Sequence, residues 1–293
     1  MDKALSKSFI FATIWGICST VDIKCARMFE QFITNIFNPN DMARGSIFDS
    51  FVVFKSKEPD WEKWETIQPD FDYSPGKKWH EIIVPNKTTV RYSYLLKKTI
   101  LAGHCMYFTG VSGTGKSILI ANTLKEMKEE GTIVPLNLTF SAKTGSKQVQ
   151  ASIEAKLNPL RQFGKILLKP QVPNTKLVVF VDDINMPEVE KYGAQPPIEL
   201  LRQVIDSSGF YDRTTFNWKE LIDTVIVCAS VPPGGGRVGI SERFIRHFHL
   251  INIPASEDEI MQQIFGTILG NFFKVYSFSD EIDKMTDDIV SAT

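Results

Sequence analysis

The sequence predicts an α/β fold in which a parallel five-stranded sheet is flanked by helices. From about residue 87 onward, apolar runs of strand length alternate with amphipathic runs of helical length, which is the pattern of a parallel sheet with helical crossovers. The run KLVVFV at 176–181 is apolar almost throughout, as expected for a strand covered on both faces. A glycine-rich turn at 110–115 joins the first apolar run to a helical run.

The first 37 residues predict two packed amphipathic helices. In the second helix, Phe29, Ile33 and Ile36 recur at helical spacing. The basic start and the apolar run at 9–18 also resemble a secretory signal. That run is too short to span a membrane, and the helical spacing that follows it favours the packed helices.

Residues 38–86 have a different texture. Pro, Asp, Gly and Lys interrupt short aromatic pieces such as SIFDSFVVF and DWEKWETI, so we expect loops and short strands. Trp61, Trp64 and Trp79 are expected to cover the edge of a core, and a binding role for one of them is the alternative. Together, residues 1–86 are interpreted as an N-terminal extension.

The α/β region is expected to cover residues 87–254. In its second crossover helix, Val149, Ile153 and Leu157 form one apolar stripe. The five expected strands are 106–110, 132–140, 176–181, 223–230 and 249–253, and the helices after the first four begin near Lys116, Ser146, Ile198 and Ser241.

Beyond Pro254 the pattern is helical only. Residues 255–293 are therefore expected to be the start of a truncated α-helical small subdomain. The chain is interpreted as a fragment, a partial gene product or an excised module.

Composition limits the classes of partner. The formal net charge is −1, so no overall field draws the chain to nucleic acid or to an anionic membrane. The four cysteines lie far apart without a CxxC pair, which predicts free thiols in a reducing compartment. His247 and His249 lack a third ligand nearby in the sequence, so we expect no metal site there.

The turn GVSGTGKS is the strongest functional signal. It matches GxxxxGK[ST] and stands between a strand and a helix, as this phosphate-binding motif requires. Glycines let backbone N–H groups converge on phosphate oxygens, and the helix N-terminus adds partial positive charge. We expect Lys116 to neutralise the outer phosphates and the Ser117 hydroxyl to hold Mg²⁺. The expected nucleotide-binding residues of the turn are Gly110, Val111, Ser112, Gly113, Thr114, Gly115, Lys116 and Ser117.

Two aspartates end the third expected strand. Asp182 is expected to complete the Mg²⁺ shell with Ser117, directly or through water. If the site hydrolyses ATP, Asp183 is placed to orient the attacking water. Many such ATPases use glutamate there, and aspartate is one methylene shorter. Because a displacement of about 1 Å can cost on the order of 10²-fold in rate, we expect slow turnover or mainly binding.

The fourth strand and the short helix after it carry further candidates. Ser230 ends that strand, where related ATPases place a polar residue that senses the γ-phosphate, although Val231 follows instead of an amide side chain. SERFIRHF holds Arg243 and Arg246, and an arginine that reaches a neighbouring module's phosphate can raise its rate roughly 10³- to 10⁵-fold. We prefer Arg243 in this role. The alternative is that both arginines pair with surface carboxylates.

These motifs together resemble the AAA+ modules of dynein heavy chains. The resemblance is carried by VVFVDDINMPEVEKYGAQPPIELLRQVIDSSGFYDR, PPGGGR and ERFIRHF. GVSGTGKS, LNLTFSAKTGSKQVQ and the N-terminal FIFATIWGICSTVD are most similar to the third of the six modules in an axonemal member. The resemblance covers nearly the whole chain.

The resemblance implies a part of a microtubule motor that drives ciliary or flagellar beating. Its implied cofactors are ATP or ADP with Mg²⁺, bound by Lys116, Ser117 and Asp182, and Arg243 is the implied finger toward the preceding module's site. In that family the first module does the main hydrolysis, and the nucleotide state of the third gates the ring. The departures from the family pattern at Asp183 and Ser230 indicate a chain that is a weak ATPase or inactive on its own.

The implied partners are the neighbouring AAA+ modules of the same heavy chain. Microtubules and the dynein light and intermediate chains are reached only through the parent protein, without direct contact with nucleic acid or membrane. The implied location is the cytoplasm and cytoskeleton, in the axoneme of a cilium or flagellum.

Three other classes are weighed against this interpretation. A stand-alone helicase or remodelling ATPase calls for a basic groove or stacking aromatics near the site, and neither is apparent in the sequence. A GTPase calls for an NKxD motif, which the sequence lacks. A structural module with a vestigial phosphate loop stays open.

Overall fold

The computed structural model describes residues 3–21, 23–54, 59–71, 73, 75–76, 78, 82–235, 237–279, 282 and 285–292. Trp79 therefore lies outside the described residues. The chain divides into two compact units, one of residues 16–22 and 93–253 and the other of residues 1–15, 23–92 and 254–293. Within the described ranges, no helix combines the length and apolar character needed to cross a membrane.

The first unit contains the expected five-stranded sheet, with all of its strands parallel. The strand order is β11-β3-β10-β7-β4, so the phosphate-loop strand β3 lies next to β10, and β10 lies next to β7. The strands are β3 (Cys105–Thr109), β4 (Ile133–Thr139), β7 (Lys176–Asp182), β10 (Thr224–Ser230) and β11 (Phe248–Asn252). The predicted fold class is confirmed.

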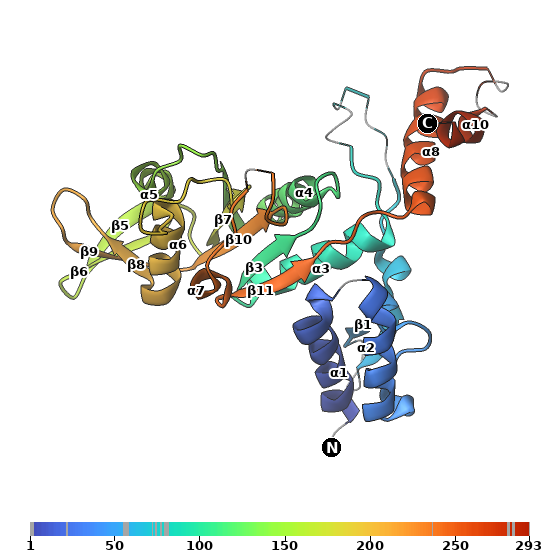
Figure 1. The fold of residues 1–293 in the computed structure, drawn as a ribbon, viewed down its shortest axis with the longest axis horizontal. Coiled ribbons are helices and arrows are strands. Elements are labelled where there is room, and N and C mark those ends of the chain that lie inside the picture. Colours follow the sequence, from blue (N-terminus) through green and yellow to red (C-terminus); the bar gives the residue numbers. More distant parts are fainter. Residues whose placement is uncertain are drawn as a thin grey trace. The chain divides into compact units, whose positions relative to one another are not determined.

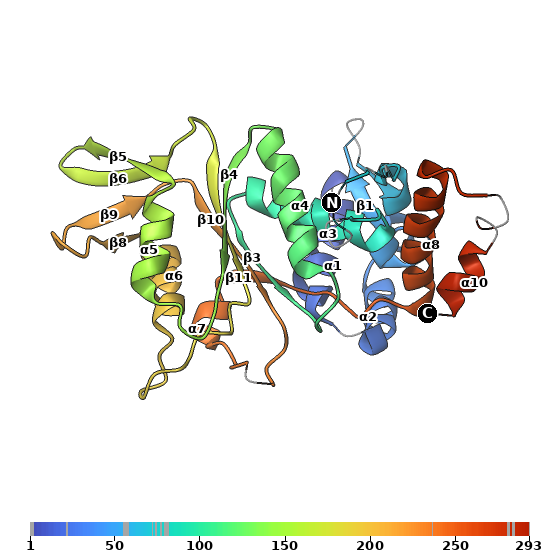
Figure 2. The ribbon, with the colours of Figure 1, turned by 90° about the horizontal axis from the view of Figure 1, so that it is seen from above.

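Helices cover both faces of this sheet, with α4 on one face and α5 and α6 on the other (Figures 1 and 2). The helices are α3 (Lys87–Leu101), which is shared between the two units, α4 (Lys116–Glu129), α5 (Ser146–Glu154), α6 (Pro196–Ser207) and α7 (Glu242–Ile245). The short helix η1 (Cys18–Thr20) adds a hydrogen bond to the edge strand β11, in which the Ser19 hydroxyl donates to the Leu250 carbonyl at 2.5 Å.

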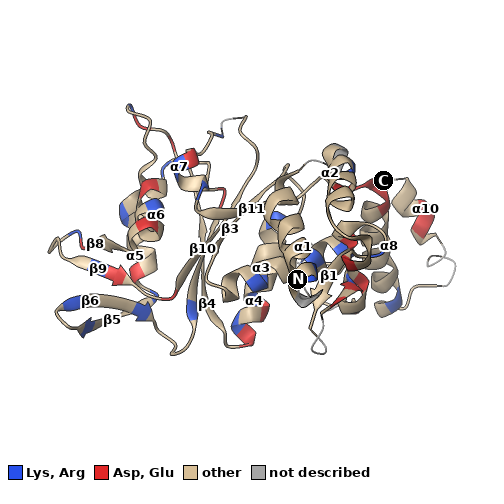
Figure 3. Cartoon of the chain, turned by 90° about the horizontal axis from the view of Figure 1, so that it is seen from below, with Lys and Arg blue, Asp and Glu red and all other residues tan. Residues whose placement is uncertain are grey.

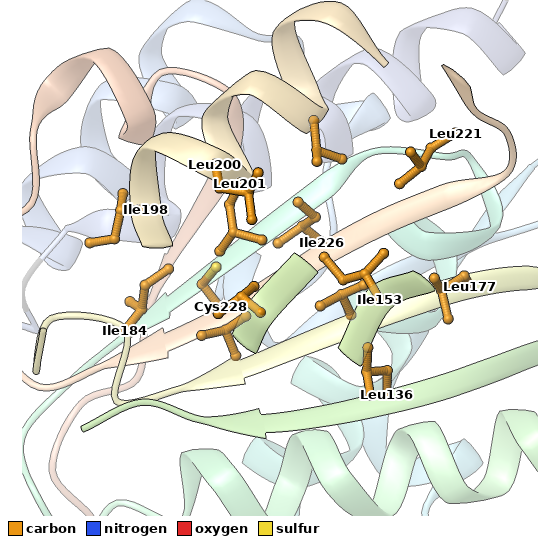
Figure 4. Packing of buried hydrophobic residues seen from close by; sticks show 14 of the residues in the cluster. Leu136, Ile153, Leu177, Ile184, Ile198, Leu200, Leu201, Leu221, Ile226 and Cys228 are labelled. Carbon is orange, nitrogen blue, oxygen red and sulfur yellow. The ribbon is translucent and has the colours of Figure 1, made fainter. Parts of the chain in front are cut away.

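The core of this unit explains why β7 is almost wholly apolar. All five residues from Leu177 to Val181 are buried. Figure 4 shows side chains of α5 and α6, including Ile153 and Leu201, packed over Ile226 and Cys228 of β10. Each fully buried side chain of this size contributes about 1.5–3 kcal/mol relative to its exposed state.

A second sheet of four strands was not predicted. It lies beside α5 and α6, on the side away from the main sheet (Figure 2). Its order is β5-β6-β9-β8, with bounds β5 (Leu157–Gln162), β6 (Lys165–Pro170), β8 (Gly209–Tyr211) and β9 (Trp218–Leu221).

The expected helical stripe through Leu157 is wrong at its last residue. The helix α5 ends at Glu154, and Leu157 begins β5, although its side chain is buried as expected. A two-residue turn then reverses the chain, because Phe163 and Gly164 both have positive φ, at 49° and 75°. Positive φ at both central residues is typical of the type I′ turns that suit hairpins.

The other unit contains the two predicted N-terminal helices and the predicted short strands. Trp64 is fully buried, stacks on Phe51 at 4.7 Å, and donates its indole N–H to the Phe48 carbonyl, so its predicted core role is confirmed. Its elements are α1 (Lys3–Ile17), α2 (Ile23–Ile36), η2 (Pro39–Asp41), η3 (Ile47–Asp49), β1 (Ser50–Val53), β2 (Asp60–Lys63), η4 (Trp64–Ile67), α8 (Asp258–Val275) and α10 (Thr286–Ser291).

Candidate functional site

The candidate residues gather where three neighbouring strands end. The loop after β3, Asp182 at the end of β7 and Ser230 at the end of β10 share one edge of the sheet, because the strands are parallel and adjacent. A cavity of about 300 Å³ opens at this edge. It is lined by Ser112, Gly113, Gly115, Lys116, Ser117, Ile118, Asp182, Asp183, Ser230, Val231 and Arg237.

Glycine is required in the loop for two different reasons. Gly113 and Gly115 have φ of 86° and 76°, a conformation that costs other residues roughly 1–2 kcal/mol. A Cβ on Gly110 would instead lie 2.3 Å from the Ile253 carbonyl oxygen. The loop therefore turns sharply into α4, whose first residue is Lys116, and it places a helix N-terminus at the cavity.

Lys116 is buried at the wall of this cavity, with 7% of its surface exposed. Its ammonium donates to the carbonyls of Gly110 and Val111 at 2.8 and 2.7 Å, and to the Thr114 hydroxyl at 3.2 Å. Burial lowers the pKa of Lys116, and the negative charges nearby oppose that shift. The cation thus fixes the shape of the loop that surrounds it.

The two aspartates differ in their surroundings. Asp182 receives the Asp183 backbone N–H on Oδ1 at 3.1 Å, and its own carbonyl receives the Phe140 N–H at 3.0 Å. Asp183 has a φ of 50°, which aspartate tolerates better than most residues. Its Oδ1 lies 3.8 Å from Nη2 of Arg237.

Ser230 is nearly buried and already has a partner. The Tyr107 hydroxyl donates to its Oγ at 2.8 Å. Burial raises the pKa of Tyr107 well above its usual value, so the phenol stays protonated and remains a donor. The sequence analysis did not identify Tyr107, because in the sequence it is one more residue of the apolar run that predicts the first strand.

The two arginines near α7 lie outside the residues that line the cavity. Arg243 is exposed, and its guanidinium makes no ion pair or hydrogen bond with the described part of the chain. Arg246 pairs with Asp206 at 3.4 Å, and His247 pairs with the same carboxylate at 3.0 Å. Charged residues of both signs alternate along α6 beside them (Figure 3). Surface pairing, the alternative interpretation, thus describes Arg246 but not Arg243.

Arg237 is a charged lining residue to which the sequence analysis assigned no role. It lies in PPGGGR, the loop after β10, where Gly234 and Arg237 exchange two backbone hydrogen bonds of 3.2 and 3.1 Å. The sequence feature that could have pointed to Arg237 is an arginine at the end of a glycine run that follows a strand of the sheet.

The residues fit a nucleotide with its metal ion. Ser112 to Lys116 offer backbone N–H groups and an ammonium, and Asp182 and Asp183 add two carboxylates to the lining of the same cavity. Among the described residues no cluster of three or more His, Cys, Asp or Glu side chains is arranged to hold a metal. A magnesium ion held by Ser117 and Asp182 would therefore take its other ligands from phosphates and water, which is how Mg²⁺ is usually bound.

Comparisons with known proteins agree with this geometry. The family model described as "P-loop containing dynein motor region" matches residues 71–256, and the model "Dynein heavy chain AAA lid domain" matches residues 1–66. Dynein axonemal heavy chain 6 of Homo sapiens is 38% identical over 297 aligned positions, covering 100% of this chain and 7% of that protein.

Two further relatives are similar. Dynein axonemal heavy chain 12 of Mus musculus is 35% identical, and the alignment covers 98% of this chain and 10% of that protein. Dynein axonemal heavy chain 3 of Homo sapiens is 37% identical, and the alignment covers 90% of this chain and 7% of that protein. The chain thus spans 7–10% of the relatives it matches. It belongs to the dynein heavy chain family, as part of the P-loop containing motor region.

Proposed function

We propose that this chain is an ATP-binding AAA+ module of an axonemal dynein heavy chain, the third in the ring, with a regulatory site that hydrolyses slowly. One observation carries the proposal. The phosphate loop, Lys116, Asp182 and Asp183 line a single cavity at the carboxyl edge of the sheet.

Each wall of the cavity has a distinct role. The loop N–H groups and Lys116 hold the phosphates of ATP or ADP, and Ser117 with Asp182 holds Mg²⁺. Bound Mg-ATP supplies a γ-phosphoryl group for transfer to water. Asp183 orients that water, and Ser230, positioned by Tyr107, contacts the terminal phosphate.

One feature supports slow turnover. The carboxylate of Asp183 is one methylene shorter than the glutamate that many such ATPases use, so it is placed less well to orient the attacking water. A single-turnover assay on the intact heavy chain tests this, with Asp183→Glu expected to hydrolyse faster than wild type and Asp183→Asn slower. Fast hydrolysis by the wild-type site contradicts it.

The surface supports a place in a ring of modules. Arg243 is exposed on α7, where it can reach a phosphate held by the preceding module. Neighbouring modules are thus the direct partners, whereas microtubules and the light and intermediate chains act through the parent protein. The proposed location is the axoneme of a cilium or flagellum, within the cytoskeleton.

Nucleotide binding is tested by thermal melting with Mg²⁺ and ATP, ADP or GTP. A nucleotide at 100 times its dissociation constant should stabilise the fold by about 2.7 kcal/mol. We expect a shift with ATP and ADP that Lys116→Met abolishes. Lys125→Met, an exposed lysine on the same helix, is the matched control and should keep the shift. Absence of any shift favours the structural module with a vestigial loop, and rapid turnover by the isolated chain favours a stand-alone ATPase.

A further inference from the structure

We propose that Arg237 binds the terminal phosphate of ATP from within the same chain, and so determines whether the site prefers ATP or ADP. The inference rests on the proposed nucleotide site. It assigns to the loop after β10 a role in distinguishing triphosphate from diphosphate, which the phosphate loop alone does not provide.

The first support is the position of Arg237. It lines the same cavity as Lys116 and Ser117, but it lies in the loop after β10, whereas they follow β3. The phosphate loop supplies the N–H groups at the start of α4. An arginine on the loop after β10 supplies a second cation, on a segment that shares the cavity with Asp182 and Asp183.

The second support is a frame of hydrogen bonds that holds this loop. The Asn185 side-chain amide donates to the Val231 backbone carbonyl at 2.8 Å, and the Asn185 backbone carbonyl accepts the Val238 N–H at 3.2 Å. Asn185 is 2% exposed, so this frame is shielded from water. Both ends of the loop are thereby fixed to the segment that follows Asp183.

The third support is the incomplete pairing of the guanidinium. Its Nη2 lies 3.8 Å from Asp183 Oδ1, which is within reach of an ion pair but longer than a hydrogen bond. Its Nε is buried and has no hydrogen-bond partner within the described structure. A guanidinium presents five donors in a planar fork that matches phosphate oxygens, so this arginine retains the capacity for a second anion.

The arrangement therefore sets two anions in competition for one cation. When a terminal phosphate is present, Arg237 donates to it and its attraction to Asp183 is reduced. A diphosphate lacks the oxygens that reach this position, so the pair with Asp183 persists. Arg237 thus contributes to the affinity for ATP and little to that for ADP.

The test measures equilibrium affinity rather than hydrolysis. We would titrate wild type, Arg237→Ala and Arg237→Lys with ADP and with a non-hydrolysable β,γ-imido analogue of ATP, by calorimetry in Mg²⁺. From the strength of charge-assisted hydrogen bonds, we expect Arg237→Ala to lower the affinity for the triphosphate analogue about 10- to 100-fold. The affinity for ADP should fall less than about 3-fold. Arg237→Lys keeps the charge without the fork and should lie between.

The controls separate this inference from the proposed function. Arg161→Ala removes an exposed arginine on β5, away from the lining residues, and should leave both affinities unchanged. If wild type binds neither nucleotide, the proposed function fails. If wild type binds both and Arg237→Ala weakens both equally or neither, only the role of Arg237 is refuted.

A double-mutant cycle tests the competition itself. Asp183→Asn should raise the affinity for the triphosphate analogue more in the wild-type background than in the Arg237→Ala background. The reason is that Arg237, no longer paired with Asp183, accounts for part of the gain in affinity. If the affinity rises equally in the two backgrounds, Arg237 does not exchange between Asp183 and the phosphate, and that part of the inference is refuted. Melting without nucleotide identifies any variant that is unfolded, in which case Arg237→Lys replaces Arg237→Ala in both experiments.

Discussion

Replacing Gly110 by alanine should destabilise the α/β unit even when no nucleotide is added. The new Cβ would lie 2.3 Å from the Ile253 carbonyl oxygen and 3.3 Å from its carbon. Relief requires about 1 Å of separation between the end of β3 and the segment after β11, because Cβ–oxygen contacts need roughly 3.2 Å. The Ile253 N–H donates to the Thr109 carbonyl at 2.8 Å across this same gap.

The cost follows from these two effects. Overpacking of a tight site costs about 1–3 kcal/mol, and loss of one buried backbone hydrogen bond adds about 1 kcal/mol. A total of about 2–4 kcal/mol corresponds to a fall in melting temperature of about 5–15 °C for a unit of this size. Circular dichroism on wild type and variant would measure it.

Gly145→Ala is the matched control. Gly145 has a φ of −103°, and no other atom lies within 4 Å of the position that a Cβ would take, so alanine costs only the weaker helix cap, about 1 kcal/mol or less. If the two variants melt at the same temperature, the close approach of Gly110 to Ile253 has no energetic weight, and the reasoning is refuted.

Three further predictions concern packing, a hydrogen bond and pH. Phe244→Ala should lower the free energy of unfolding by about 3–5 kcal/mol in a urea titration, because the ring is fully buried and lies 4.7 Å from that of Phe248; a loss below about 1 kcal/mol would contradict this packing. Tyr107→Phe should cost about 1–2 kcal/mol in the same assay, since the donor to Ser230 is removed, and an unchanged midpoint would show that this bond contributes nothing. Asp212→Asn should melt at a lower temperature than wild type at pH 7, because a lysine and backbone N–H groups hold the pKa of Asp212 below its usual range. That stabilisation is present above about pH 4 and fades as the pH falls, so a difference that widens in acid would exclude it.

The sequence was most informative where burial dictates the pattern. The central strands of the main sheet were predictable because they are covered on both faces and form apolar runs, as Leu177–Val181 does. The second sheet was not, because β5 exposes most of its side chains and leaves no apolar run or clean alternation. Its turn at Phe163 and Gly164 carried the available signal.

The candidate site shows the same division. Lys116 and Asp182 belong to motifs of fixed spacing, so their positions could be inferred from the chain alone. The partners Tyr107 and Arg237 lie 123 residues from Ser230 and 54 from Asp183 in sequence (230 − 107 and 237 − 183), and only the strand order brings them together. Pairings of this kind depend on tertiary structure, which local pattern does not encode.

The three hydrogen bonds that Lys116 donates within its own loop have a consequence for how a ligand arrives. An incoming phosphate must exchange with carbonyl acceptors for that ammonium, so part of the attraction between the two charges is offset by the internal bonds that are given up. In return, the cradle is ordered in advance, and little chain entropy is lost when the phosphate binds. The hydrogen bonds of Lys116 therefore reduce the gain from charge attraction on binding, and they also reduce the loss of chain entropy.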